Sequence, residues 1–184
     1  MKPSMQSLNP DGKPAQQNVI HETMELFRHM PCSQDIQKVA SLLQDTGFFH
    51  SYEIDVAIEL VKEWLSKGPD SGYRFIFSDS KEGGCLAGYC CFGATPCTLS
   101  SYDIYWIAVH PDFQKTGLGT KIFCETEMLI QKARGTRIYI DTSQSEKYLP
   151  TRKFYEHVGF TQAALLEDFF APGDGKIIYC KIPA

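Results

Sequence analysis

The chain has no hydrophobic run long enough to cross a membrane. Of its 184 residues 43% are hydrophobic, yet no stretch approaches the roughly 20 apolar residues that a spanning helix needs. The first 17 residues are polar and lack the apolar core of a secretory signal peptide. These absences predict a cytoplasmic protein without a membrane partner.

Positive charge is also scarce. Lysine and arginine number 18 against 22 aspartates and glutamates, which gives a net charge of −4. Nucleic-acid-binding domains usually carry a basic excess that matches the phosphate backbone. We therefore expect no nucleic-acid partner, whereas a homodimer is compatible with the composition.

The seven cysteines lack the spacing of a metal site or a disulfide scaffold. None forms a C-x-x-C pair, and no histidine cluster accompanies them. Zinc sites and disulfide frameworks both depend on such spacing. We expect buried, reduced thiols and no bound metal.

The pattern of apolar residues predicts one α/β domain of the α+β type over residues 19–184, behind a disordered tail at 1–18. The expected sheet is mixed and largely antiparallel, with about six to seven strands and about four flanking helices. Antiparallel hairpins come first, and a parallel crossover follows. The expected strands cover residues 23–30, 73–78, 85–93, 101–109, 137–141, 161–167 and 176–182.

Helix boundaries carry signals of their own. Ser33 and Ser51 are expected to cap the first two helices, because a hydroxyl can accept a hydrogen bond from a free backbone N–H at a helix start. Helical spacing gives the second helix a predicted buried stripe. This stripe consists of Ile54, Ile58, Val61 and Leu65.

The most specific local pattern is a strand that runs directly into a glycine-containing loop and a helix. Residues 104–109 are apolar, and residues 114–119 read Gln-x-x-Gly-x-Gly. Glycines allow close backbone approach, and the free N–H groups at a helix start attract anions. A phosphate-binding P-loop is excluded because its Gly-Lys-Ser/Thr ending is absent, and a dinucleotide fingerprint would need a glycine at Ile122.

A second motif makes this pattern more specific. Ile-Ala-Val-His-Pro at 107–111 and Gln-x-x-Gly-Leu-Gly-Thr at 114–120 are followed by Phe-Tyr-Glu-His-Val-Gly-Phe at 154–160. At this spacing, the chain resembles the GNAT superfamily of acyl-CoA-dependent N-acyltransferases over about residues 24–181. The resemblance implies the GNAT fold and acetyl-CoA, a form of coenzyme A, as the cofactor.

The resemblance also implies which residues would bind that cofactor. The loop N–H groups would surround the pyrophosphate, and the pantetheine arm would pair with the strand backbone like an added strand. The implied residues are Ile107, Ala108, Val109, Gln114, Lys115, Thr116, Gly117, Leu118, Gly119 and Thr120.

Two side chains are candidates for catalysis. Tyr155 matches the family tyrosine that protonates the departing sulfur, and Asp103 matches the position of the base in histone-type members. Strand alternation predicts that Asp103 shares a face with Tyr105, Ile107 and Val109. Other bases remain open, namely Glu146, Asp141 and a proton relayed by water. Tyr148 stands where many members have asparagine.

Two aromatic loops are expected to shape the acceptor pocket, through Phe48, Phe49 and Tyr52 and through Asp168 and Phe169. The predicted function is transfer of acetyl from acetyl-CoA to a primary amine of a small molecule, by direct attack in a ternary complex. Two alternatives stay open. One is acetylation of a protein or peptide N-terminus, and the other is a catalytically silent acyl-CoA-binding regulatory module.

Overall fold

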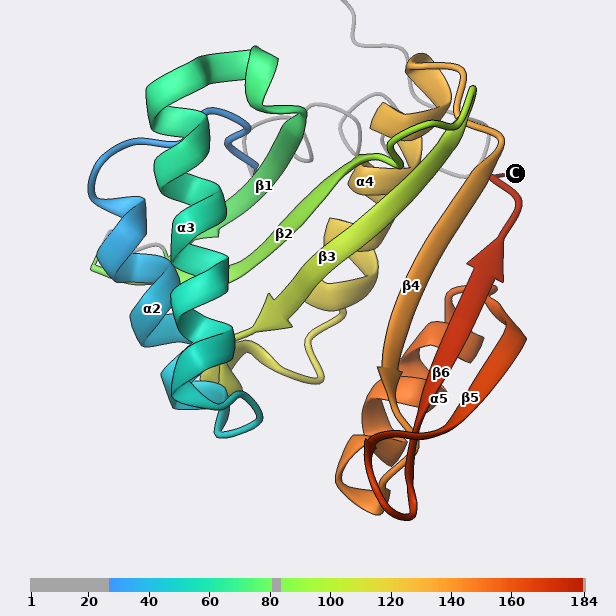
Figure 1. Ribbon diagram of the computed structural model, residues 1–184. Coiled ribbons are helices and arrows are strands. Elements are labelled where there is room, and N and C mark those ends of the chain that lie inside the picture. Colours follow the sequence, from blue (N-terminus) through green and yellow to red (C-terminus); the bar gives the residue numbers. More distant parts are fainter. Residues whose placement is uncertain (1–26, 81–83, 184) are drawn as a thin grey trace, which may run out of the picture.

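The computed structural model describes residues 27–80 and 84–183. These residues form a six-stranded sheet and four α-helices (Figure 1). The expected tail at 1–18, the first half of the expected first strand and the tip of the first hairpin lie outside them. Of that first strand, Arg28 forms an isolated antiparallel bridge with Phe77.

The strands follow the order β1-β2-β3-β4-β6-β5. Among the described strands, the β3–β4 pair alone is parallel, as the hairpin-then-crossover pattern predicts. The strands are β1 (Tyr73–Asp79), β2 (Leu86–Ala94), β3 (Ser101–Val109), β4 (Arg137–Ser143), β5 (Thr161–Ala171) and β6 (Asp174–Lys181).

Two helices pack on each face of the sheet. On one face, α2 (Asp35–Thr46) and α3 (Ser51–Lys67) pack against β1–β3, with Val39, Leu43 and Val61 fully buried. On the other face, α4 (Leu118–Lys132) and α5 (Leu149–His157) enclose a second core. The expected fold class is confirmed.

Both expected helix caps are wrong by one residue. Gln34 occupies the cap of α2 without a side-chain hydrogen bond, and His50 caps α3. The N–H of His50 donates to the Glu53 carboxylate at 2.7 Å, which satisfies a group that the helix leaves unpaired. In the predicted stripe, Leu65 is exposed because the apolar face of α3 continues through Trp64 instead.

The cysteines correct another expectation. All seven are free, but only Cys90 and Cys91 are buried, and Cys180 is half-buried. The other four are exposed, because they lie in loops or on the outer side of α4. The expectation of buried thiols therefore holds for Cys90 and Cys91 and is wrong for the four exposed cysteines.

Candidate active site

A gap between β3 and β4 divides the sheet. The two strands pair only where they begin, from Ser101 opposite Arg137 to Asp103 opposite Tyr139. Beyond that point β4 continues along β6, while β3 continues along β2, and the two strands diverge (Figure 1). Among the described residues, one edge of β3 therefore has no strand partner over residues 104–109.

The backbone of Ile107 and Val109 faces this gap. His110 donates its N–H to the carbonyl of Ala87 at 2.9 Å, on the β2 side. Since successive residues of a strand direct their backbone groups to opposite sides, those of Ile107 and Val109 point away from β2. The Gln114 amide donates to the Val109 carbonyl at 3.2 Å, so the strand edge and the following loop are connected.

A β-bulge at Tyr105 changes which side chains share a face. The β2–β3 register shifts there, with Cys91 opposite Trp106 and Phe92 opposite Ile104. An extra residue reverses the alternation of the residues that follow it.

Because of this bulge, the prediction that Asp103 shares a face of β3 with Ile107 and Val109 is wrong. Tyr105, Trp106 and Ala108 pack in the core against α2 and α3, whereas Ile107 and Val109 pack in the core against α4. Asp103 therefore shares the α2–α3 face with the first group and lies opposite Ile107 and Val109.

The loop after β3 presents a row of backbone N–H groups. Lys115 and Gly117 have positive φ angles of 61° and 83°, and Gly117 caps α4 in a left-handed conformation that glycine adopts easily. The first helical hydrogen bond of α4 runs from Lys121 to Gly117. Within the described chain, the N–H groups of residues 115–120 donate no backbone hydrogen bond, which is the arrangement that binds anions.

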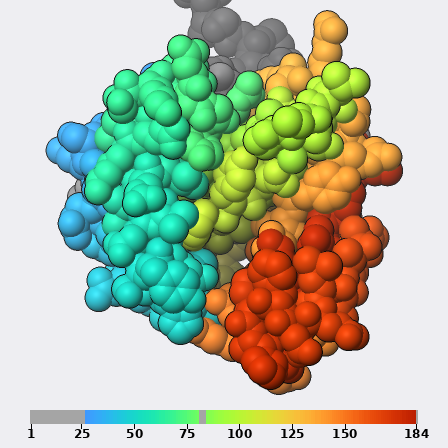
Figure 2. Space-filling model, viewed as in Figure 1, coloured from blue at the N-terminus to red at the C-terminus, as the bar shows by residue number. Residues whose placement is uncertain are grey.

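A cavity of about 620 Å³ opens beside the gap, on the face that carries Asp103. In the space-filling view, the surface is hollowed where α3, the yellow-green β3 and the red β5–β6 hairpin meet (Figure 2). Asp103 is half-buried and accepts a hydrogen bond from Thr95 Oγ1 at 2.7 Å. The lining residues are Thr95, Asp103, Ile104, Tyr105, Trp106, Tyr139, Ile140, Asp141, Lys176 and Ile178.

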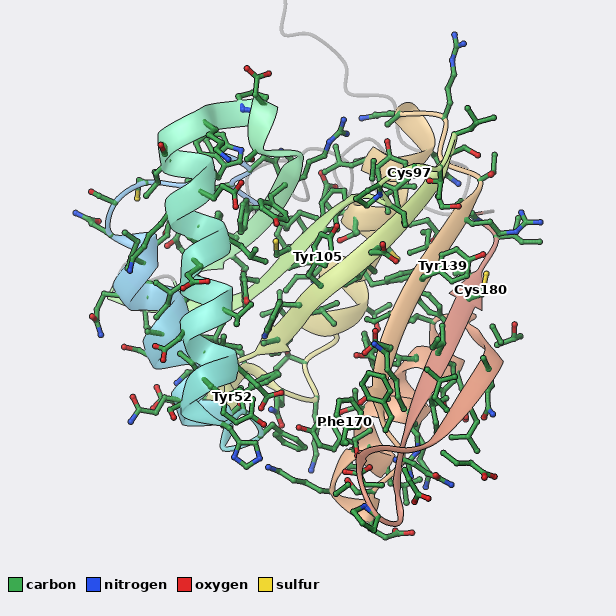
Figure 3. The ribbon with its side chains drawn as sticks, in the orientation of Figure 1. Tyr52, Cys97, Tyr105, Tyr139, Phe170 and Cys180 are labelled. Carbon is green, nitrogen blue, oxygen red and sulfur yellow. The ribbon has the colours of Figure 1, made fainter. Side chains whose placement is uncertain are left out.

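Several of these lining residues were not predicted from the sequence. Lys176 reaches from β6 to the Asp141 carboxylate on β4, with 2.7 Å between nitrogen and oxygen. Tyr105 and Tyr139 come from the two strands that diverge (Figure 3). The indole N–H of Trp106 is buried without a hydrogen-bond partner among the described residues. None of them belongs to a motif, so only the strand pairing brings them together.

Tyr155 lies on the opposite side of the sheet. It is buried on α5, and its ring contacts those of Phe160 and Tyr179 with centroids 6.0 and 5.7 Å apart. Burial, and to a smaller extent the nearby Asp141 carboxylate, raises the pKa of the Tyr155 phenol well above its ordinary value. The phenol is therefore protonated at neutral pH and can serve as a proton donor.

The aromatic residues after α2 contact the segment that follows β4. The Phe48 carbonyl accepts hydrogen bonds from Lys147 at 2.7 Å and from Tyr148 at 3.2 Å, which links this loop to η3 (Glu146–Tyr148). Phe49 packs against the α2–α3 core, and Tyr52 is exposed on α3. Neither Phe48, Phe49 nor Tyr52 lines the cavity.

The β5–β6 hairpin holds the remaining expected residues. The Asp168 carboxylate accepts the N–H of Gly173 at 2.6 Å, so it closes its own turn. The Phe169 ring is half exposed and contacts the Phe170 ring edge-on. The Lys176 ammonium nitrogen lies over it, 5.0 Å from the ring centre. Asp168 and Phe169 lie outside the cavity lining.

Two further features bear on the class of protein. Among residues 27–80 and 84–183, no group of three or more histidine, cysteine, aspartate or glutamate side chains could hold a metal ion. None of the helices in the same ranges is both long and apolar enough to span a membrane.

Comparison with known proteins identifies the family. Residues 72–162 match the family model described as an acetyltransferase (GNAT) domain. A protein of the GNAT family from Desulfovibrio desulfuricans is 42% identical, with a TM-score of 0.83, over 86% of this chain and 98% of that one. No curated protein matches the sequence. The chain belongs to the GNAT family of acetyltransferases, whose members use acyl-CoA.

More distant structures share the fold. An aminoglycoside 6'-N-acetyltransferase complexed with coenzyme A is 14% identical, with a TM-score of 0.67, over 86% of this chain and 97% of that one. The ribosomal-protein-S18-alanine N-acetyltransferase from Escherichia coli is 17% identical, with a TM-score of 0.64, over 86% and 94%. These two proteins act on a small molecule and on a protein, respectively, so the shared fold accommodates both kinds of acceptor.

Proposed function

We propose that this chain transfers acetyl from acetyl-CoA to a primary amine of a small molecule, in a ternary complex without an acyl-enzyme. The observation that carries this proposal is the unpaired edge of β3, which leads directly into the free N–H groups of residues 115–120. A pantetheine arm can pair with such an edge as an added strand, and a pyrophosphate fits the helix start.

The proposed chemistry uses the two faces of the sheet. Asp103 takes a proton from the ammonium of the acceptor, because a protonated amine has no lone pair for attack. The neutral nitrogen then forms a bond to the thioester carbonyl carbon, and the N–H of Val109 stabilises the oxygen that becomes negative. When the carbon–sulfur bond breaks, Tyr155 gives its proton to the thiolate. The nitrogen passes its surplus proton through water to the Tyr155 phenolate, and Asp103 releases its proton to solvent, which leaves the amide and the free thiol.

The placement of the two candidates supports this sequence of steps. Asp103 lines the cavity on the α2–α3 face, whereas Tyr155 lies in the core against α4 and α5. The acceptor and the leaving thiol would thus occupy opposite sides of the gap. Asp141 remains the alternative base, since it also lines the cavity.

A small acceptor fits the size of the cavity. Its volume of about 620 Å³ lies within the roughly 300–1,000 Å³ of small-molecule sites. A protein N-terminus is the second candidate acceptor, favoured by the exposed Phe169 and Phe170 beside the opening.

Release of free thiol from acetyl-CoA, measured with a panel of amines, tests the proposal. We expect turnover with small primary amines. Turnover with peptides alone would replace the proposed acceptor by a protein N-terminus. Binding of acetyl-CoA without turnover on any amine would instead indicate a catalytically silent module.

A further inference from the structure

We infer that the acceptor is a monocationic amine with an aromatic body, and that Lys176 sets this charge preference by neutralising Asp141. The inference rests on the proposed function and refines its substrate class. It is drawn from the charges and the rings that line the cavity.

The charged side chains of the lining leave one negative charge. The lining contains two carboxylates, Asp103 and Asp141, and one ammonium, Lys176. Asp141 is already paired with Lys176 at 2.7 Å, whereas Asp103 receives, from the part of the chain that the structure describes, only the neutral hydroxyl of Thr95. One carboxylate is thus available for one ammonium, and a second positive charge on the acceptor would find no unpaired partner.

Lys176 is held firmly in this role. Its side chain is only 22% exposed, and its ammonium lies 5.0 Å from the centre of the Phe169 ring. A cation that is bound by both a carboxylate and an aromatic face loses little further freedom when a ligand arrives. The Lys176–Asp141 pair is therefore a fixed part of the wall.

Three aromatic residues line the cavity, together with three isoleucines and Thr95. Tyr105 and Trp106 lie on the strand that carries Asp103, and Tyr139 lies directly opposite Asp103 on β4. The ring of Tyr105 is itself positioned by an edge-on contact with Tyr73, with centroids 5.6 Å apart. Aromatic residues that line one cavity favour a flat, apolar body on the ligand, through burial and through ring–ring contact.

The inference is tested by kcat/KM for four acceptors, namely 2-phenylethylamine, hexylamine, 1,4-diaminobutane and a tetrapeptide with a free N-terminus. With the unaltered protein, 2-phenylethylamine should exceed both hexylamine and the diamine by about tenfold or more. Lys176→Gln exposes the Asp141 charge, so the ratio of diamine to phenylethylamine should rise on the order of tenfold. Lys67→Gln removes a lysine of an exposed ion pair on α3 and should leave the ratio unchanged.

A second variant separates the two parts of the inference. Tyr139→Leu should lower kcat/KM for phenylethylamine several-fold and leave hexylamine nearly unaffected. A preference for the diamine in the unaltered protein, or an unchanged ratio in a folded Lys176→Gln variant, would overturn the inference. Neither result would affect the proposed function, which fails only if no small amine is acetylated.

Discussion

The sheet consists of two halves, β1–β2–β3 and β4–β6–β5, and the strands of the first half are far more buried than those of the second. In β2, eight consecutive residues are buried, because helices cover both faces of the strand. In β5, ten of eleven residues are exposed, and within the described chain only α4 and α5, on one face, cover the β4–β6–β5 half. The gap between β3 and β4 is the boundary between these halves, so the site lies where tight packing ends.

The largest expected effect is on stability. Phe92 is fully buried on β2, so Phe92→Ala should lower the free energy of unfolding by about 3–5 kcal/mol. Leu166→Ala, in the exposed β5, should change it by no more than about 0.5 kcal/mol. Urea denaturation of both variants checks this contrast, and equal losses would mean that the two halves contribute alike.

The next effect concerns catalysis. Tyr155→Phe should lower kcat by about 10²- to 10⁴-fold, the usual contribution of a general acid, while Kd for acetyl-CoA stays unchanged. Because burial raises the pKa of this phenol, its proton should not be lost at any pH below about 10. The alkaline side of the pH profile of kcat should therefore be the same in both proteins below that pH. Unchanged kcat in the variant would exclude Tyr155 as the acid.

A smaller effect is expected on cofactor binding. Gly119→Glu places a carboxylate among the N–H groups at the start of α4, so Kd for coenzyme A should rise on the order of 100-fold. Gly119→Ala is the matched control, since an added Cβ would meet Phe154 at an ordinary 3.4 Å. Calorimetric titration distinguishes the two variants, and tight binding by Gly119→Glu would disprove the proposed phosphate site.

The smallest effect is a gain in stability. The Tyr89 hydroxyl is buried without a hydrogen-bond partner among the described residues, and burial of an unpaired polar group costs about 1–3 kcal/mol. Tyr89→Phe should therefore raise the free energy of unfolding by up to about that amount, with kcat unchanged. A destabilised variant would mean that the hydroxyl has a partner in solution.

Elements with a strong local pattern were predicted well from the sequence. β3 has the predicted bounds, and α4 begins directly after Gly117. The bulge at Tyr105 was not predicted, because the apolar run of β3 contains no glycine or other local signal there. Asp103 was consequently placed on the wrong face relative to Ile107.

The contacts that line the cavity could not be predicted from the sequence. Lys176 and Asp141 are 35 positions apart in the sequence, and only the pairing of β4 with β6 brings them together. Their contact depends on register, which a single sequence specifies weakly.

Hydrogen exchange at the amides of β3 tests the central claim most directly. The N–H groups of Ile107 and Val109 face the gap, whereas that of Ala108 faces β2. We expect acetyl-CoA to slow exchange at Ile107 and Val109, because the pantetheine arm pairs with that edge, and to leave Ala108 nearly unchanged. Unaltered exchange at both Ile107 and Val109, under conditions in which acetyl-CoA is bound, would contradict the proposed site.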